Sequence, residues 1–216
     1  MILPRLYAIV DMGSCARVGR DPLDVGRAYL AGGARLLQLR AKGLPSGAFL
    51  ELATLMAADA QSADARLIVN DRSDVATLAG AHGVHVGQDD LSPRDVRRIV
   101  GGEALVGLST HTSTQVEAAL LEPVSYVAVG PVFDTTTKGT GDEAVGPDLV
   151  RVAVGLAARR VPIVAIGGLT LERAGAVIEA GADAVAVISD LLHGDIEARV
   201  RQWVTALERG ARASPL

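Results

Sequence analysis

Short apolar segments and longer helix-type segments alternate without a break along this chain of 216 residues. The short segments are nearly continuous in apolar side chains, which is typical of strands buried on both faces of a parallel sheet. We expect strands at Leu6–Val10, Arg35–Leu39, Leu67–Asn70, Val84–Val86, Leu105–Leu108, Tyr126–Val129, Ile163–Ile166 and Ala184–Val187. We expect helices at Asp24–Ala31, Ser46–Ala60, Ser73–Ala79, Pro93–Val100, Thr114–Leu121, Pro147–Ala158, Leu171–Ala180 and Ile196–Glu208.

Eight strands that alternate with eight helices predict an α/β fold, a (β/α)8 or TIM barrel that residues 1–216 form as a single domain. The alternative is an open, doubly wound sheet, which would usually carry a G-x-G-x-x-G turn after its first strand. The chain has Asp11, Met12, Gly13 and Ser14 at that position. Because this fingerprint is missing, the closed barrel is favoured.

The composition and the N-terminal segment limit the kinds of partner that we expect for this protein. The net charge is −4 and only 3% of the residues are aromatic, whereas a nucleic-acid interface would need a basic patch and usually aromatic side chains. The first 13 residues contain no apolar stretch long enough for a signal peptide or a membrane span. Cys15 is the single cysteine, which fits a reducing compartment. We therefore expect a cytoplasmic protein with neither a nucleic-acid nor a membrane partner.

Polar side chains interrupt the second expected strand on one face. Side chains alternate along a strand, so Gln38 and Arg40 share a face, which Lys42 can continue, while Leu37 and Leu39 take the other face. Residues that face the helices should be apolar, so the polar face points into the barrel mouth. Buried cations are costly without anionic partners. The pattern therefore indicates a cationic clamp for a phosphorylated ligand, with a set of rim salt bridges as the alternative.

Carboxylates follow the third and fourth expected strands. Asn70 and Asp71 end the third strand, and Asp90 follows the fourth. The carboxyl ends of neighbouring parallel strands meet at one rim, where catalytic residues of such barrels lie. Mg2+ is typically held by one or two carboxylates together with phosphate oxygens. We therefore expect Asp71 and Asp90 to bind Mg2+, although either could instead cap the helix that follows it.

Hydroxyl-rich segments follow the fifth and sixth expected strands. Ser109 lies where the fifth strand ends, and its hydroxyl could bind an anion or cap the next helix. Thr135, Thr136, Thr137 and Lys138 belong to a long loop after the sixth strand. Long loops of this kind are often functional, so we expect Lys138 to approach a phosphate when ligand binds; the alternative is a surface loop without function.

Glycines and a short helix start mark the last two strands. Gly167 and Gly168 follow the seventh strand, and Ile188 and Ser189 follow the eighth. This is the usual position of the phosphate site in such barrels, because glycine lets backbone N–H groups approach an anion. The segment therefore predicts a site for a phosphate monoester.

Two histidines lie close to the expected site. His85 lies inside a buried strand, where a histidine satisfied within the core is the better interpretation. His111 lies near the barrel mouth, where it either stabilises a loop or helps a proton transfer. The chain has no histidine and cysteine spacing of the kind that binds zinc.

Taken together, these segments resemble the thiamine phosphate synthase family, whose close relatives are the TenI-type thiazole tautomerases. The segments that carry the resemblance are Gln38–Lys42, Asn70–Arg72, Gly83–Asp90, Gly107–Ser109, Gly130–Phe133 with Thr135–Lys138, Gly167–Gly168 and Val187–Ser189. Each is weakly specific alone, but they occur in the family order over nearly the whole chain. The resemblance implies that hydroxymethylpyrimidine diphosphate loses pyrophosphate and that the nitrogen of a thiazole phosphate captures the pyrimidine carbocation, giving thiamine phosphate.

The resemblance also implies a role for each matching residue. Asp71 and Asp90 would be the Mg2+ ligands. The diphosphate contacts that assist the reaction would be Arg40, Lys42, Ser109 and Lys138, with Gln38 and Asn70 near the diphosphate and pyrimidine. The thiazole phosphate would be held by Thr135, Thr136, Thr137, Gly168, Ile188 and Ser189.

The alternatives to the synthase would require different residues in the barrel mouth. A TenI-like thiazole tautomerase would keep the phosphate site but would not need the full set of carboxylates and cations. A ligand-binding barrel without chemistry would have no use for so many charges in its mouth. We therefore expect a transferase that acts on small phosphorylated substrates, and the sequence leaves open whether it forms a homo-oligomer.

Overall fold

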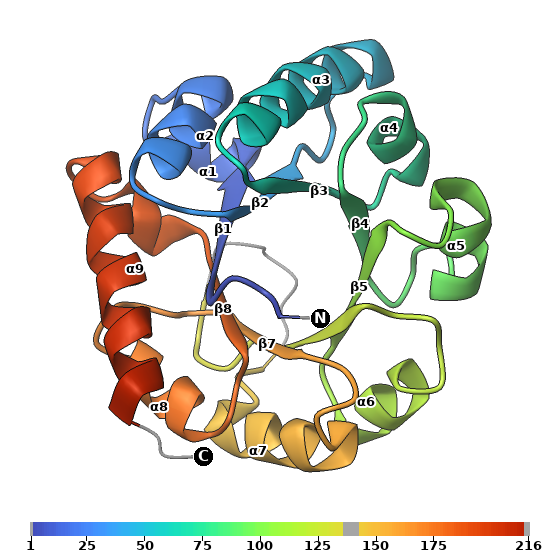
Figure 1. The fold of residues 1–216 in the computed structure, drawn as a ribbon, viewed down its shortest axis with the longest axis vertical. Helices are drawn as coiled ribbons and strands as arrows, with labels where there is room; N and C mark the ends of the chain where they lie inside the picture. Colours follow the sequence, from blue (N-terminus) through green and yellow to red (C-terminus); the bar gives the residue numbers. More distant parts are fainter. Residues whose placement is uncertain (1, 136–142, 214–216) are drawn as a thin grey trace.

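The computed structural model describes residues 2–135 and 143–213. Its eight strands form a closed barrel in chain order, and every neighbouring pair is parallel. The helices surround this barrel (Figure 1). The (β/α)8 barrel predicted from the alternation of segments is therefore confirmed.

The strands are β1 Leu6–Asp11, β2 Leu36–Arg40, β3 Arg66–Asn70, β4 Gly83–Val86, β5 Leu105–Thr110, β6 Tyr126–Val129, β7 Ile163–Ile166 and β8 Ala184–Val187. The helices are α1 Met12–Arg17, α2 Pro22–Ala31, α3 Ser46–Ser62, α4 Ser73–Leu78, α5 Pro93–Val100, α6 Ser113–Ala119, α7 Gly146–Ala157, α8 Ala174–Glu179 and α9 Ile196–Ala213, with the short 3-10 helix η1 Ser189–Leu192. Among the described residues, no helix has the length and apolar character needed to cross a membrane.

All eight predicted strands and all eight predicted helices are present, with differences at their ends. The largest differences are at α8, which begins at Ala174 rather than Leu171, and at α9, which runs on to Ala213. The short helix start expected after the eighth strand is present as η1. The short helix α1 was not predicted, because its one or two turns leave too little room for a helical repeat of apolar residues.

Two apolar clusters hold the barrel together. The larger cluster lies between strands and helices and includes Leu37 and Leu39, the outward residues of β2. The smaller cluster fills the inside of the barrel and includes Ile9, Ile68 and the N-terminal Leu3. The N-terminal segment lies across the end of the barrel seen in Figure 1. The barrel is therefore a packed core at this end.

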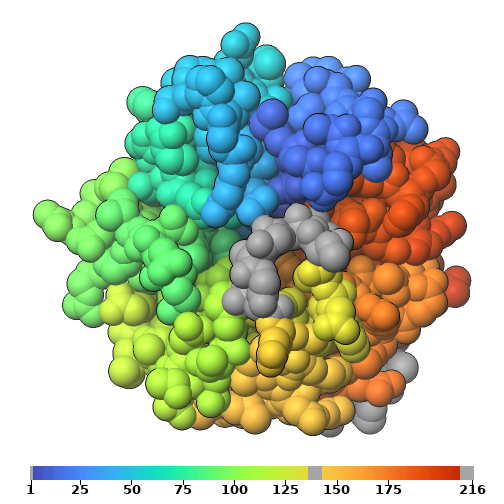
Figure 2. Space-filling view, turned by 180° about the vertical axis from the view of Figure 1, so that it is seen from behind, coloured from blue at the N-terminus to red at the C-terminus, as the bar shows by residue number. Residues whose placement is uncertain are grey.

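Figure 2 shows the opposite end, where the loops that follow the strands surround a central hollow. Because these loops come from every part of the chain, residues distant in sequence meet there. The alternation of side chains predicted for β2 is confirmed, since Gln38 is buried inside the barrel while its neighbours join the outer cluster.

Candidate active site

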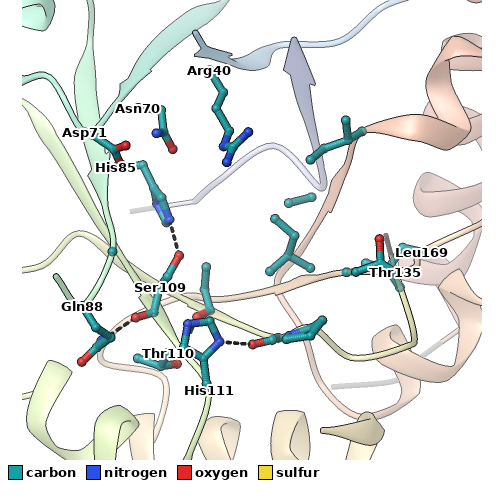
Figure 3. Close-up of a pocket in the computed structure, with 18 of the residues that line it drawn as sticks. Arg40, Asn70, Asp71, His85, Gln88, Ser109, Thr110, His111, Thr135 and Leu169 are labelled. Atoms are coloured by element: carbon teal, nitrogen blue, oxygen red, sulfur yellow. Dashed lines mark hydrogen bonds between the residues drawn. The ribbon is translucent and has the colours of Figure 1, made fainter. Parts of the chain in front are cut away.

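A pocket with a volume of about 550 Å³ occupies the hollow at the carboxyl ends of the strands. Ten of the residues predicted for the site line it: Arg40, Lys42, Asn70, Asp71, Asp90, Ser109, Thr135, Gly168, Ile188 and Ser189. Figure 3 shows Arg40, Asn70 and Asp71 along one side, with Thr135 and Leu169 across from them. The pocket thus has a charged side and a side built by the last loops of the barrel.

The guanidinium of Arg40 lies at the charged side and is held by an ion pair. Its Nη1 donates to Oδ2 of Asp11 over 2.5 Å. The other carboxylate oxygen of Asp11 accepts from the backbone N–H and the hydroxyl of Ser14, at 2.8 and 2.7 Å. Burial alone would raise the pKa of Asp11, but the hydrogen bonds from Ser14 and Arg40 outweigh it, and the pKa lies below its ordinary value. Asp11 is therefore a buried carboxylate that fixes Arg40.

Asp11 was not predicted as part of the site, although the sequence carries a signal for it. A carboxylate that ends a buried strand, three residues before Ser14, has the spacing of a helix N-cap. Asp11 is indeed the N-cap of α1. Overlooking the N-cap at Asp11 therefore accounts for two features that were not predicted, the helix α1 and the ion pair with Arg40.

Lys42 and Asp71 form the next pair along the rim. Their Nζ and Oδ2 atoms are 3.5 Å apart. Asp71 adopts a φ of 64°, in the left-handed region that is costly for a residue with a side chain. Its backbone N–H donates to the carbonyl of His85 over 2.8 Å, which ties the end of β3 to β4. Such strained residues cluster at functional sites.

The carboxylates of Asp71 and Asp90 face one another. Burial, followed by repulsion from Asp90, raises the pKa of Asp71, and Lys42 only partly opposes this. Asp90 is oriented by the N–H of Gly87, which donates to its Oδ2 over 2.7 Å. Two carboxylates held this close are unfavourable unless a proton or a cation lies between them.

This pair fits a hard divalent cation. Over residues 2–135 and 143–213, no group of three or more His, Cys, Asp or Glu side chains could hold a metal. The protein would supply two carboxylates, and a ligand and water would supply the remaining oxygens. That is how Mg2+ is commonly bound beside phosphate groups, whereas zinc would require more protein ligands.

Ser109 lies at the floor of the charged side, where β5 ends. Its Oγ is 2.8 Å from Nε2 of His85, and its carbonyl accepts from Nε2 of Gln88 over 2.6 Å (Figure 3). His111 donates from Nδ1 to the carbonyl of Gly130 over 2.5 Å. This bond joins the loops after β5 and β6, as the loop-stabilising interpretation of His111 predicts.

Two glycines shape the opposite side of the pocket. Gly167 and Gly168 have φ values of 101° and 60°, which residues with side chains rarely adopt. A Cβ at Gly168 would lie 2.6 Å from the carbonyl oxygen of Asp134. Only glycine therefore lets the loop after β7 pack against the loop after β6 and leave its backbone beside the pocket.

The short helix η1 follows β8 and is anchored to α9 by a buried residue. The buried carboxylate of Asp190 accepts from Nε and Nη2 of Arg199, at 3.1 and 2.8 Å, and from the indole N–H of Trp203 over 2.6 Å. Both partners belong to α9. The position of Ile188 and Ser189 at the pocket thus depends on a buried anchor that was not predicted.

Gln38 is a predicted site residue that does not line the described pocket. Gln38 lies inside the barrel, where its Nε2 donates to the hydroxyl of Tyr7 over 2.7 Å. Thr136, Thr137 and Lys138 lie outside the described residues. The roles expected for these four residues stay predictions.

Comparison with known proteins identifies the family. A family model described as "Thiamine monophosphate synthase" matches residues 6–191. A thiamine-phosphate synthase of Koribacter versatilis is 46% identical over 195 residues, which cover 88% of this chain and 90% of that protein. One of Anaeromyxobacter dehalogenans is 40% identical over 220 residues, which cover 98% of both.

A solved structure agrees with these sequence relatives. Thiamine phosphate pyrophosphorylase from Pyrococcus furiosus is 26% identical, covers 96% of this chain and of its own, and superimposes with a TM-score of 0.85. The resemblance inferred from the segments around the barrel mouth is confirmed. The chain belongs to the thiamine monophosphate synthase family.

Proposed function

We propose that this chain is a thiamine phosphate synthase, which joins hydroxymethylpyrimidine diphosphate to a thiazole phosphate and releases pyrophosphate. One observation carries the proposal: a single pocket combines the Asp71 and Asp90 pair, with Arg40 and Lys42 beside it, and a glycine-lined loop across from it. A diphosphate suits the first side and a phosphate monoester suits the second.

The charged side would bind the diphosphate. Arg40 has five N–H donors, and its bond to Asp11 engages Nη1, so other donors are available to phosphate oxygens. Lys42 is largely exposed and can turn from Asp71 to the ligand. Asn70 and Ser109 add neutral polar groups to the lining of the same pocket.

The opposite side would hold the thiazole phosphate. The residues that line the pocket there include Gly168, Ile188, Ser189 and Thr135. Residues 136–138 follow Thr135 directly, so we propose that Thr136, Thr137 and Lys138 complete the contacts as the family resemblance implies. Binding both substrates in one pocket supplies the orientation that a reaction between two molecules requires.

Asp71 and Asp90 would bind Mg2+, for which their facing carboxylates are suited. When bound, Mg2+ supplies positive charge that neutralises the diphosphate as it departs. Arg40, which Asp11 holds in place, would stabilise the same charge with little reorganisation when the bond breaks. Lys42 would add positive charge once it has turned to the ligand.

The proposed reaction does not require a general base for its central step. The bond between the pyrimidine methylene carbon and the diphosphate oxygen breaks, and that oxygen keeps the electron pair. The lone pair of the thiazole nitrogen then forms the new bond to carbon. The residues of the charged side therefore act by binding and by charge stabilisation. We also propose a cytoplasmic location, which the single buried cysteine, Cys15, supports.

The proposal is tested by measuring pyrophosphate release. The protein is mixed with the pyrimidine diphosphate and the thiazole phosphate, with and without Mg2+, and the thiamine phosphate formed is quantified. We expect equal amounts of both products only when both substrates and Mg2+ are present. Conversion of a thiazole carboxylate phosphate to its aromatic isomer, without the pyrimidine substrate and without pyrophosphate release, would instead identify a tautomerase.

A further inference from the structure

A line of hydrogen bonds crosses the inside of the barrel beneath the pocket and ends at Ser109. Gln38 Nε2 donates to the Tyr7 hydroxyl over 2.7 Å, and the Tyr7 and Tyr126 hydroxyls are 2.8 Å apart. The Tyr126 hydroxyl is 3.0 Å from Nδ1 of His85, and Nε2 of His85 is 2.8 Å from Oγ of Ser109. The line therefore joins β2, β1, β6, β4 and β5, the strand that carries a residue of the proposed diphosphate site.

Glycine at position 107 makes this line possible. In the barrel register, Gly107 lies between its partners His85 on β4 and Tyr126 on β6. A Cβ at Gly107 would lie 2.1 Å from Cζ of Tyr126 and 2.4 Å from Nδ1 of His85. Because this side chain is missing, the rings of His85 and Tyr126 stack over β5, with centroids 5.5 Å apart.

The direction of the hydrogen bonds follows from the first donor. The amide nitrogen of Gln38 can only donate, so the oxygen of Tyr7 accepts from it. Among the described residues, the Tyr126 oxygen is the acceptor within reach of the Tyr7 proton, so that proton is directed to Tyr126. The proton of Tyr126 is then directed to Nδ1 of His85. Burial raises the pKa of both tyrosines, so both hydroxyls keep their protons.

The direction of these hydrogen bonds also determines where the protons of His85 and Ser109 lie. An imidazole that accepts at Nδ1 carries its proton on Nε2, so His85 donates to Oγ of Ser109. The hydroxyl proton of Ser109 is then directed away from His85, toward the pocket that Ser109 lines. With the opposite tautomer, Ser109 would donate to His85 and present its lone pairs to an incoming anion, which would be repulsive.

We propose that Tyr7, Tyr126 and His85 are positioning residues, which hold the Ser109 hydroxyl as a hydrogen-bond donor to an oxygen of the bound diphosphate. The identity of the anion rests on the proposed function, but the orientation of the hydroxyl does not. The line of buried groups would thus prepare the donor before the ligand arrives, so that binding need not reorient it.

The tautomer of His85 tests the orientation directly, without any ligand. Long-range 1H–15N spectra of the labelled protein distinguish imidazoles protonated at Nε2 from those protonated at Nδ1. The His85 signals are identified by their loss in His85→Gln or, should that variant not fold, by elimination with His82→Gln, His111→Gln and His193→Gln. We expect the Nε2–H form at neutral pH. The Nδ1–H form would overturn the proposal even if the protein proved to be an active synthase.

A double-mutant cycle tests whether Tyr126 acts through Ser109. The affinity for inorganic pyrophosphate with Mg2+ is measured for the wild-type chain, Tyr126→Phe, Ser109→Ala and the double variant. Tyr126→Phe should weaken binding about tenfold when Ser109 is present, as expected for losing an oriented hydrogen bond to a charged group. In the Ser109→Ala background, the same change should have little effect. Equal effects in both backgrounds would contradict the proposal.

Tyr29→Phe is the matched control. Tyr29 is also a fully buried tyrosine, but its hydroxyl has no hydrogen-bond partner within the described part of the chain. Removing that hydroxyl should leave pyrophosphate affinity unchanged. If the wild-type chain did not bind pyrophosphate at all, the proposed function would fail, and the tautomer of His85 would still decide the orientation of Ser109.

Discussion

Asp11 and Arg40 are register partners at the carboxyl ends of β1 and β2, and their side chains form an ion pair of 2.5 Å. The carboxylate of Asp11 also caps α1. A single buried residue thus begins a helix and fixes a cation at the pocket. Because the ion pair is almost entirely enclosed, it should matter far more to stability than an exposed pair does.

Asp11→Ala should lower the free energy of unfolding by about 3 kcal/mol, because it leaves a largely buried Arg40 without its partner and removes a helix cap. Urea denaturation measures the change. Asp24→Ala is the control, since Asp24 forms an exposed pair with Arg27 at 3.9 Å and should contribute less than ~1 kcal/mol. Equal losses in both variants would contradict the buried character of the Asp11 pair.

The contribution of Asp11 should also depend on pH. Its pKa is lowered in the folded protein, so the folded state is favoured when the carboxyl is ionised. The contribution should be complete above the unfolded pKa of about 3.9 and should be lost as the pH falls through the lower folded pKa. We therefore expect the stability difference between the wild-type chain and Asp11→Ala to narrow as the pH falls below about 4. A difference that grows over this range would show the opposite sign of the pKa shift.

Gly107→Ala should be strongly destabilising, by about 3 kcal/mol or more, because the new methyl group would overlap the rings of Tyr126 and His85. Gly155→Ala is the control. Gly155 lies inside α7 with open space where its Cβ would be, so alanine there should raise stability by about 0.5–1 kcal/mol. Thermal and urea unfolding of both variants check this. A stable Gly107→Ala variant would contradict the close packing of Tyr126 and His85 against Gly107.

Asp190→Asn should affect substrate binding at one side of the pocket and not at the other. It weakens the anchor that Arg199 and Trp203 provide for η1, so the KM for the thiazole phosphate should rise several-fold while the KM for the pyrimidine diphosphate changes little. Asp148→Asn, which changes an exposed pair with Arg151, is the control. An equal rise in both KM values would mean that the anchor supports the whole fold rather than this side of the pocket.

Much of the fold could be predicted because strand and helix periodicity is a local property of the chain. The apolar runs of the eight strands and their order predicted a parallel α/β fold, and the missing G-x-G-x-x-G turn favoured the closed barrel over an open sheet. The two faces of β2 were also predictable, since Leu37 and Leu39 cannot share a face with Gln38 and Arg40. The short helices α1 and η1 were not predictable by periodicity, because one or two turns contain no repeat.

The residues of the candidate site were predictable where a charged side chain follows the carboxyl end of a strand. Asp71, Asp90 and Lys42 meet this condition, and they lie together in one pocket. The partners of the site residues were harder to predict, because they depend on how strands are staggered. Gln38 has the right face and the right strand, yet it lies one layer too deep to line the pocket and contacts Tyr7 instead.

The central claim is that Asp71 and Asp90 bind a divalent cation together with a diphosphate. Calorimetric titration of inorganic pyrophosphate, with and without Mg2+, into the wild-type chain, Asp71→Asn and Asp90→Asn tests it most directly. We predict that Mg2+ strengthens binding to the wild-type chain by at least about tenfold, and that either substitution removes this gain while circular dichroism shows an unchanged fold. Pyrophosphate affinity that is independent of Mg2+ in the wild-type chain, or a gain that persists in both variants, would contradict the account.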